Sequence, residues 1–405
     1  MRDEVTRDEW GRRAIVLILL LGVLRLWITW GSELTDTEAY YASWAHWPSL
    51  GYYDHPPLVA WASWLVSRVG TSGFVMRLMP AACLIVFELL VYALARRMFS
   101  PRAAFLSVLV TSMLPAFVGI GSLVNPEALL APLWLVVLIA LYDLRAHDEA
   151  WRPTLLGAAI GVAFLAKYTG LLAVPIALTW VSASRETRRW LRRPSFWTAG
   201  LVALAIASPV IVWNAQRGVP SVRLHLVERV ASPSLSGYAH NAVRAALSQL
   251  VMFHPIALPG FIVVAIACLR RARTDVRFRF LAWTSLPVLA FFLAMMVRVR
   301  DAEPHWTMVG YVPLLIGMGA LLDEAFERRL ARAYVGALVT SSAVALAAFV
   351  VCSGYAWAPW NDAINETLGW NRITSSVRRS AATLGGGAVV ASHHNVLCGH
   401  LAWAL

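Results

Sequence analysis

Apolar residues in this chain fall into long runs that are separated by short polar segments. Because the hydrocarbon core of a bilayer is about 30 Å thick, one crossing helix needs roughly 20 apolar residues. The first run follows two arginines but ends without a small-residue cleavage site, so we interpret it as a retained helix and not as a signal peptide. The pattern predicts transmembrane helices at residues 14–30, 74–96, 102–122, 126–144, 196–213, 243–268, 280–297, 307–322 and 333–352.

The stretch 154–183 is too long for a single crossing helix and has basic clusters at both ends. Its middle is polar, with Lys167 followed by Tyr168, Thr169 and Gly170. This pattern predicts two short helices that rise and return, each about 20 Å long at 1.5 Å per residue. They bring the prediction to about eleven transmembrane segments in an all-α, polytopic membrane helical bundle.

The composition agrees with a membrane protein. The mean hydropathy is +0.62, 59% of the residues are apolar and only 14% are charged, which excludes an ordinary soluble domain and a disordered chain. The net charge of +12 does not indicate a nucleic-acid partner, because the arginines form short clusters between the apolar runs. By the positive-inside rule, the side with these clusters and the N-terminus is cytoplasmic. We therefore expect a multi-pass protein of the inner (cytoplasmic) membrane, surrounded by membrane lipids.

This topology predicts two parts, a transmembrane domain at residues 1–352 and a short external tail at 353–405 that we interpret as a truncated outer-face domain. Nearly every motif with an acidic residue or a histidine falls on the external side, whereas the cytoplasmic loops are short and basic. Function is therefore expected at the outer face. The predicted external segments are 31–73, the turn 123–127, the tip near Lys167, 214–242, 298–306 and the tail.

The first external loop combines aromatic residues with carboxylates. Its aromatic residues recur at spacings of three and four, which predicts amphipathic helices that lie in the membrane interface. An aromatic belt that only anchors the protein is the alternative. However, Asp36, Glu38 and Asp54 interrupt the belt, and a carboxylate so near lipid is unfavourable unless it is partnered or functional. The pattern favours a functional site, with Tyr40 and Tyr41 as candidate substrate-binding residues.

The three carboxylates of this loop are the candidate catalytic residues. Asp36 and Glu38 lie two positions apart, so on an extended segment they face the same way, and either is suited to accept a proton as general base. Asp54 and His55 precede a rigid Pro-Pro pair and are suited to an acid–base site or a metal site, with Mg²⁺ or Mn²⁺ as the candidate ion. A turn-capping role is the alternative for Asp54, and the sequence does not separate the two. His55 is also a candidate substrate-binding residue.

Two further external turns carry candidate charges. Glu127 follows Asn125 and Pro126 at the start of a predicted helix, where the helix dipole favours a carboxylate and capping alone explains it. The same turn is expected to face the first loop, where Glu127 would orient an acceptor or hold a metal ion. Lys167 is the only lysine in the chain. Its ammonium is costly in an apolar hairpin unless it meets an anion such as phosphate, and the alternative is a side chain that reaches the headgroups.

Other outward polar residues supply candidate contacts with a sugar or a phosphate. Asn214 ends one predicted span with a hydrogen-bonding side chain, for which loop chemistry alone is the alternative. The histidines and the cysteine at 393–400 match no standard metal-binding spacing. Near residue 300 the chain mixes cations suited to a phosphate with groups suited to a sugar, and an ion-paired loop is the alternative. The candidates there are Arg298, Arg300, Glu303 and His305.

Five motifs occur in a fixed order along nearly the whole chain. They are EAYYASWAHWPSLGYYDHPPLVAW at 38–61, NPE at 125–127, AKYTG at 166–170, WNAQRG at 213–218 and EPHW at 303–306. In these motifs the chain resembles bacterial membrane glycosyltransferases of the GT-C class, which are related to dolichyl-phosphate-mannose protein mannosyltransferases and to the aminoarabinose transferase that modifies lipid A. The first motif is highly specific, and the others follow in the order of that class.

This resemblance implies that a sugar is transferred from a polyprenyl-phosphate donor to a lipid, glycan or protein acceptor at the outer face. A single displacement would invert the configuration of the sugar carbon. In that class the first loop resembles Asp-Glu-Ala-Tyr-Tyr, and its Asp is the catalytic carboxylate. Thr37 stands in this place here, so Asp36 or Glu38 is expected to take over its role.

The leaving phosphate requires a cation, and the hypothesis assigns this role to Lys167, helped by Arg298 or Arg300.

Two other classes of function remain as alternatives. Buried charges also mark the substrate pathways of transporters and flippases, although the chain has no paired repeats with interrupted helices in both halves. A non-catalytic lipid-glycan binding protein is the other alternative, since Thr37 replaces the expected Asp.

Overall fold

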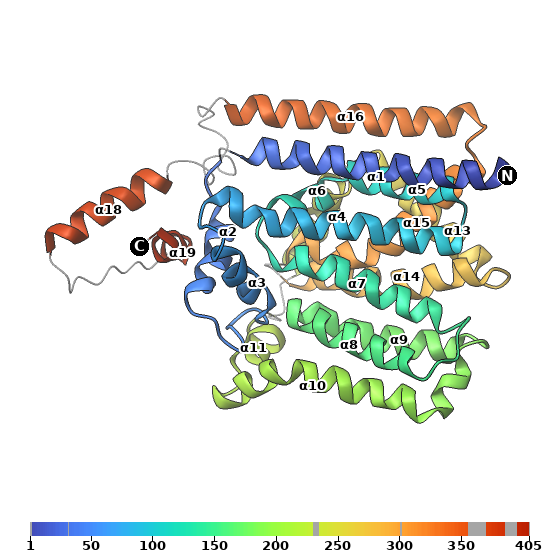
Figure 1. Cartoon of the computed structure of the whole chain (residues 1–405), viewed down its shortest axis with the longest axis horizontal. Helices are drawn as coiled ribbons and strands as arrows, with labels where there is room; N and C mark the ends of the chain where they lie inside the picture. Colours follow the sequence, from blue (N-terminus) through green and yellow to red (C-terminus); the bar gives the residue numbers. More distant parts are fainter. Residues whose placement is uncertain are drawn as a thin grey trace.

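A computed structural model describes residues 2–30, 32–229, 235–299, 302–354, 370–384 and 395–404. All regular secondary structure in these ranges is helical, which confirms the predicted all-α fold. Long helices run side by side as a bundle (Figure 1). The N-terminus lies at one end, and the short helices α2 (Asp36–Ser43), α3 (Leu58–Ser67) and α11 (Pro220–Arg223) lie at the other.

The remaining helices fall into three groups. The bundle contains α1 (Arg2–Thr29), α4 (Gly73–Met98), α5 (Pro101–Met113), α6 (Pro115–Ser122), α7 (Pro126–Asp143), α8 (Trp151–Ala166), α9 (Ala173–Ala183), α10 (Pro194–Gln216), α12 (Leu235–Met252), α13 (Ala257–Arg271), α14 (Val276–Arg298), α15 (Met308–Glu324) and α16 (Arg329–Gly354). Short helical turns are η1 (Trp44–His46), η2 (Tyr168–Leu172), η3 (Arg188–Arg192), η4 (Leu224–Glu228) and η5 (Pro304–Thr307). The tail contributes α18 (Trp370–Leu384) and α19 (Asn395–Ala404).

Within the described residues, 6 helices are long and apolar enough to cross a membrane, or up to 8 if each of two bent pairs is one span. The six are α4, α7, α10, α14, α16 and the unit of η5 with α15. The sequence predicts about eleven segments. The difference between this number and the upper count of 8 lies in three helices. Helix α1 carries Arg25 inside its apolar half, whereas α8 and α9 are the shorter helices of the predicted hairpin.

Two predicted single spans are each broken by a sharp bend. The span 102–122 divides into α5 and α6, which meet at 71°. Leu114 adopts an extended conformation there, as residues that precede a proline usually do. The span 243–268 divides into α12 and α13, which meet at 101°, and His254 at this break has a left-handed backbone with φ of 68°. Local backbone chemistry, which apolar periodicity does not report, sets both bends.

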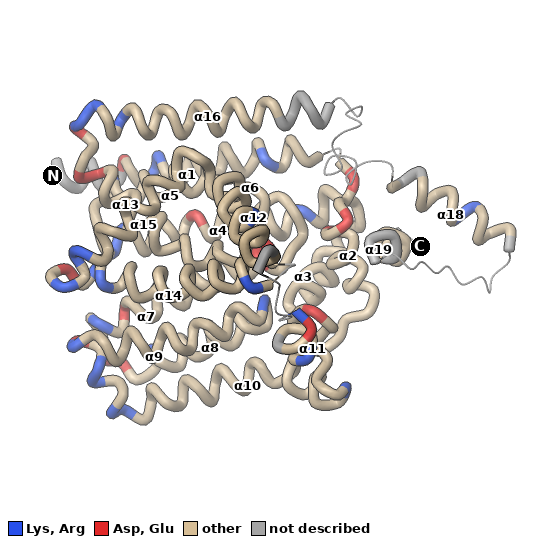
Figure 2. Tube along the Cα trace, turned by 180° about the vertical axis from the view of Figure 1, so that it is seen from behind, with Lys and Arg blue, Asp and Glu red and all other residues tan. Residues whose placement is uncertain are grey.

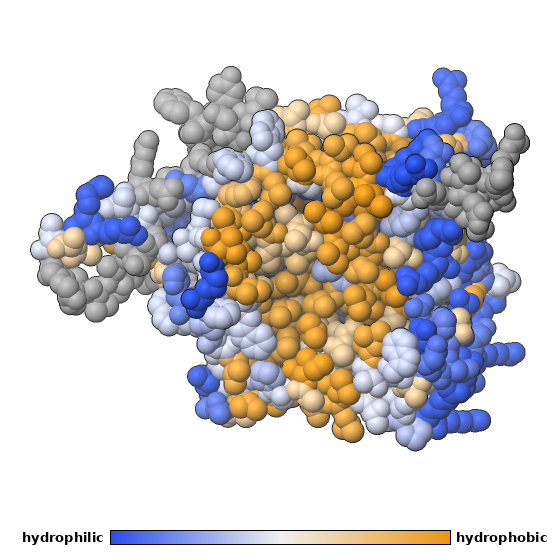
Figure 3. All heavy atoms as spheres, viewed as in Figure 1, coloured by the Kyte–Doolittle hydropathy of each residue, from blue (hydrophilic) through white to orange (hydrophobic). Residues whose placement is uncertain are grey.

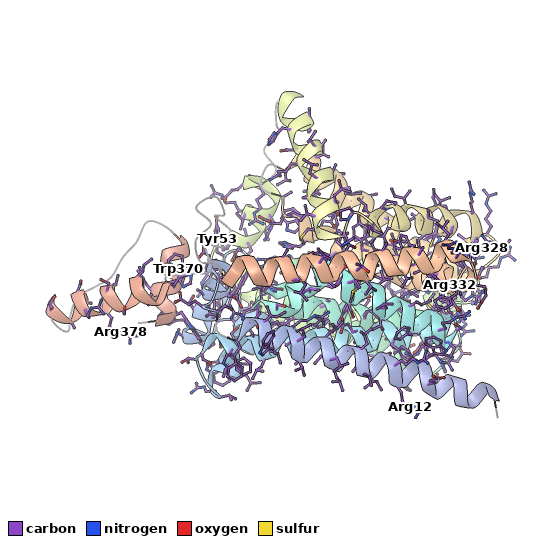
Figure 4. All side chains as sticks on the ribbon, turned by 90° about the horizontal axis from the view of Figure 1, so that it is seen from above. Arg12, Tyr53, Arg328, Arg332, Trp370 and Arg378 are labelled. Atoms are coloured by element: carbon purple, nitrogen blue, oxygen red, sulfur yellow. The ribbon has the colours of Figure 1, made fainter. Side chains whose placement is uncertain are left out.

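Charge separates the two ends of the bundle. Lys and Arg gather at the end that holds the N-terminus (Figure 2), and an apolar surface occupies the middle of the molecule (Figure 3). Arg12, Arg328 and Arg332 lie at this basic end, whereas Tyr53 and Trp370 lie at the opposite one (Figure 4). This arrangement agrees with the arginine clusters of a multi-pass membrane protein. The first-loop helices α2 and α3 therefore lie at the end away from the basic clusters.

A buried ion pair joins α1 to α4 inside the bundle. Both Nη atoms of Arg25 lie 3.3 Å from Oε1 of Glu88, and the Ser112 hydroxyl donates to the same oxygen at 2.7 Å. Arg25 also donates to the Ser112 carbonyl at 3.2 Å. Glu88 is completely buried and Arg25 is 7% exposed. Charged groups are tolerated at such depth only when they are paired, so this network holds three helices together.

The Ser112→Ala substitution is expected to lower the free energy of unfolding by about 1–2 kcal/mol, because a hydrogen bond to a buried carboxylate is lost. Thermal unfolding of the detergent-solubilised protein measures this change. Ser208→Ala is the matched control, since the Ser208 hydroxyl is exposed and bonds only to Ala205 of its own helix. Equal unfolding temperatures for the two variants would contradict the prediction.

Candidate active site

Helix α2 begins at Asp36 because Thr35 caps it. The Thr35 hydroxyl accepts a hydrogen bond from the Glu38 N–H at 3.3 Å, and the Glu38 carboxylate accepts one from the Thr35 N–H at 2.9 Å. Arg77 of α4 donates two more to this carboxylate at 2.8 and 2.6 Å, and the Val124 N–H donates another at 3.2 Å. Glu38 is completely buried. These donors occupy both oxygens, so Glu38 fastens α2 to α4 and to the turn before α7.

Asp36 has a different partner from Glu38. Its Oδ1 is 3.2 Å from Nε2 of His400, which belongs to α19. Thr37, the residue between the two acids, is exposed. The two carboxylates therefore do not face the same way, because the segment is a capped helix and not the extended strand that the sequence analysis assumed.

Asp54 lies at the centre of a second cluster. The Tyr40 hydroxyl donates to Asp54 Oδ1 at 3.1 Å, and His225 Nε2 lies 3.0 Å from the Asp54 carbonyl oxygen. His55 Nε2 is 3.9 Å from Asp54 Oδ2. Burial raises the pKa of the Asp54 carboxyl above its ordinary value. The pKa of His55 is held well below its ordinary value, first by burial and then by the positive charge of Lys167, so its ring is neutral at pH 7.

Lys167 forms a third cluster with residues from two other elements. The polar hairpin tip is tight, because Gly170 approaches the backbone of Ala163 so closely that a Cβ would lie 2.4 Å from its carbonyl carbon. The ammonium of Lys167 donates to Oε1 of Glu127 at the start of α7. His305 Nε2, from η5, lies 2.8 Å from the same oxygen and 3.3 Å from the Lys167 nitrogen. Lys167 and Glu127 are both buried. The anion next to Lys167 in this structure is therefore a protein carboxylate.

The Asp54 and Lys167 clusters are electrostatic neighbours. Burial raises the pKa of Asp54 and lowers that of His55, and the positive charge of Lys167 opposes the first change and adds to the second. The negative charges of Glu127 and Asp54 add to burial in raising the pKa of Tyr41. Tyr41 is buried, and its ring packs edge-on to that of His55 at 5.5 Å. Segments far apart in sequence thus bring carboxylates, cations and hydroxyls to one place at the end of the bundle opposite the basic clusters.

The structure adds two residues that the sequence analysis missed. His225 contacts Asp54 from η4, and its ring packs against Tyr168 at 5.1 Å. The positive charge of Arg229 lowers the pKa of Asp54, His55 and His225. Arg229 forms no ion pair with any residue that the structure describes. Both residues lie in the segment 214–242, which the sequence predicts to be external, but no motif there distinguishes them from its other polar residues.

Several other candidates lie apart from the clusters or have other partners. Arg298 and Glu303 are exposed near the end of α14 and before η5. Asn214 is buried, accepts from the Ser221 N–H at 3.2 Å and donates to the Val210 carbonyl at 3.1 Å, so it shapes the turn after α10. Arg300 lies outside the described residues. His393 and His394 of the tail lie outside them as well.

The donor set around Asp54 does not fit a resident metal ion. Among the described residues, no three His, Cys, Asp or Glu side chains are grouped so that they could hold a metal. The Asp54–His55 pair offers two ligands, and one oxygen of Asp54 already accepts from Tyr40. The nearby charges of Lys167 and Arg229 further disfavour a cation there.

Comparisons with known proteins show what this chain is similar to. Residues 54–213 match the dolichyl-phosphate-mannose-protein mannosyltransferase family. The chain is 26% identical over 306 residues to the lipid A galacturonosyltransferase RgtD of Rhizobium johnstonii, covering 73% of this chain and 63% of that protein. It is 25% identical over 291 residues to the undecaprenyl phosphate-alpha-4-amino-4-deoxy-L-arabinose arabinosyl transferase of Erwinia tasmaniensis, covering 67% of this chain and 50% of that protein. The chain thus spans only part of the length of these relatives.

A solved structure has the same fold. The crystal structure of ArnT from Cupriavidus metallidurans in the apo state superposes with a TM-score of 0.60 at 17% sequence identity, covering 98% of this chain and 74% of that one. The structural match covers far more of this chain than the family match, which is confined to residues 54–213. By its motifs, its relatives and its fold, the chain is identified as a multi-pass membrane protein that resembles the GT-C class of membrane glycosyltransferases.

Proposed function

We propose that the protein transfers a sugar from a polyprenyl-phosphate-linked donor to an acceptor hydroxyl at the outer face of the cytoplasmic membrane. The observation that carries this proposal is that Asp54 lies within electrostatic range of Lys167 and Arg229, next to Tyr53 at the end of the bundle away from the arginine clusters (Figure 4). The relatives are named for a galacturonosyl and an arabinosyl transfer, so the donor sugar is hexosyl or pentosyl. The acceptor class that these names favour is a glycolipid.

The proposal assigns the role of general base to Asp54. An acceptor hydroxyl gives its proton to the Asp54 carboxylate while its oxygen attacks the anomeric carbon of the sugar. The bond between that carbon and the phosphate oxygen breaks, and the bonding pair leaves with the polyprenyl phosphate. A single displacement of this kind inverts the anomeric configuration. Burial supports the assignment, because it raises the pKa of Asp54 and makes its carboxylate a stronger base.

The leaving phosphate gains charge as the bond breaks, and fixed cations stabilise that charge. The proposal gives this role to Arg229, which has no ion pair with the described residues, together with Lys167. Glu127 and His305 would position the ammonium of Lys167 through the contacts described above. Tyr40 orients the Asp54 carboxylate through its hydroxyl. By the same proposal the N-terminus is cytoplasmic, and the active site and the tail are external.

An assay of sugar transfer from a radiolabelled polyprenyl-phosphate donor tests the proposal. Purified protein in lipid nanodiscs is expected to move the label to a glycolipid acceptor with inverted configuration, as NMR of the product reports. Binding of the donor without transfer, or movement of the donor across the bilayer without transfer, would contradict the proposal. The first result would favour a lipid-glycan binding protein, and the second would favour a flippase.

Lys167→Met is expected to reduce the transfer rate by roughly 10²-fold, since it removes a cation that faces the developing charge. The double variant Lys167→Met/Glu127→Gln separates chemistry from folding, because it removes both charges of the buried pair. We expect the double variant to unfold near the wild-type temperature and to remain slow. Wild-type transfer by the double variant would refute the role of Lys167.

The transfer rate is expected to fall on acidification, because protonation of Asp54 removes the base. The ordinary pKa of this carboxyl is 3.8, and burial raises it in this site, so half of the rate should be lost at a pH above 3.8. The pH profile of kcat/KM measures this point. Lys167→Met removes one of the positive charges that lower the pKa of Asp54, so its residual activity should lose half at a higher pH still. A half-loss at or below pH 3.8 would oppose the assignment.

A further inference from the structure

A cavity lies outside the clusters of Asp54 and Lys167, at the junction between the bundle and the tail. It has a volume of about 440 Å³, which is within the usual range of small-molecule sites. Its walls come from the end of α1 and the residues after it, from the start of α4, and from the tail helices α18 and α19. In Figure 4, Trp370 at the start of α18 lies beside the same end of the bundle as Tyr53.

The tail is held against the bundle by specific contacts. Helix α19 packs closely on α2, because a Cβ on Gly399 would lie 3.0 Å from the backbone of Tyr40. His400 then contacts Asp36 and stacks on Trp370, with ring centroids 3.8 Å apart and an angle of 8°. These contacts join both tail helices to the first residue of α2. The cavity is therefore a defined feature of the described fold.

The lining combines flat aromatic surfaces with hydroxyl groups. The aromatic rings belong to Trp30, Phe74, Trp370 and Trp403, and the hydroxyls to Ser32, Thr71, Ser72 and Thr374. Rings of this kind stack on the C–H faces of a sugar, and hydroxyls bond to its O–H groups. Among the side chains that the structure describes, no lysine or arginine lines the cavity, and burial lowers the pKa of His400 to about 4, so its ring is neutral at pH 7. Glu33 adds a carboxylate, so the lining disfavours phosphate and other anions.

We infer that this cavity binds an uncharged saccharide ring, and, resting on the proposed function, that the ring is part of the acceptor. Helix α2 connects the cavity to the reaction site. Its first residue, Asp36, contacts His400 in the cavity wall, whereas Tyr40, one turn later, bonds to Asp54. An acceptor sugar held in the cavity would therefore be anchored on the helix that orients the base.

Ligand-observed saturation-transfer NMR on the full chain in nanodiscs tests this site. The probe is the neutral disaccharide N,N′-diacetylchitobiose, and inorganic phosphate is the competitor. We expect saturable contact with the disaccharide that phosphate does not displace. Displacement by phosphate, or no contact with the disaccharide, would overturn the inference.

Two variants locate the contact. Trp403→Leu removes a ring and is expected to weaken binding about tenfold, the loss expected from roughly 1.4 kcal/mol of ring contact. Thr71→Arg, at an exposed loop position, fills the cavity without touching the core and should abolish binding. Trp151→Leu, an exposed tryptophan at the start of α8, is the matched control and should bind normally. Normal binding by both cavity variants would overturn the inference.

Variants of the reaction site and variants of the cavity separate catalysis from saccharide binding. Asp54→Asn should lose transfer and keep the disaccharide contact, because the cavity does not contain Asp54. Thr71→Arg should raise the KM for the glycolipid acceptor. A wild-type protein that binds the disaccharide but does not transfer sugar would refute only the proposed reaction. The saccharide site would stand. Transfer with unchanged acceptor KM in Thr71→Arg would refute the acceptor role.

Discussion

Asp54→Asn is expected to reduce the rate of sugar transfer by roughly 10²–10⁴-fold, the usual contribution of a positioned general base. The amide keeps the size of the side chain and can still accept the hydrogen bond from Tyr40, but it cannot take up the proton of the acceptor hydroxyl. Donor binding should change little, because the cations assigned to the phosphate are untouched. The measurement is the initial rate with labelled donor at saturating acceptor.

Asp36→Asn is the matched control for this experiment. It makes the same chemical change on the same loop, but Asp36 contacts His400 of the tail and not the Lys167 cluster. We expect the control to retain most of the transfer rate. The opposite outcome, a large loss in Asp36→Asn and near-normal transfer in Asp54→Asn, would move the base to Asp36, the residue beside Thr37.

Arg77→Met is expected to lower the free energy of unfolding by about 3–5 kcal/mol, because it leaves the completely buried carboxylate of Glu38 without its counter-charge. The same guanidinium donates to the Ser32 and Glu33 carbonyls at 2.9 and 2.7 Å, so the start of the first loop loses its anchor as well. Thermal unfolding of the purified protein in detergent measures the loss.

Glu38→Gln distinguishes a structural carboxylate from a catalytic one. Because we assign Glu38 a structural role, we expect Glu38→Gln to unfold at a lower temperature than the wild type. It should still transfer sugar at a near-normal rate when it is assayed well below its unfolding temperature. A variant with normal unfolding and no transfer would identify Glu38 as the base. The matched control for Arg77→Met is Arg68→Met, which also removes an arginine. Arg68 lies at the C-terminal end of α3, and its guanidinium packs over the ring of Trp64.

The amino-acid sequence by itself determined the fold class and the end of the bundle at which the first loop lies. Long apolar runs can satisfy their backbone in lipid only as helices, so a membrane helical bundle follows directly from the hydropathy pattern. The short hairpin around Lys167 also followed, because its length and its flanking charges exclude one crossing. The arginine clusters predicted one basic end, and the first loop was correctly placed at the other.

Only the tertiary structure decided which charged groups meet. Three carboxylates of the first loop were equivalent candidates in sequence, but Arg77 takes Glu38, His400 contacts Asp36, and Tyr40 and His225 surround Asp54. The two bends, at Leu114 and His254, likewise depend on single backbone conformations. Burial and pairing are properties of segments that are distant in the chain. An apolar pattern reports how deep each helix lies, whereas the energy of a charge depends on the neighbours that folding brings to within a few ångströms of it.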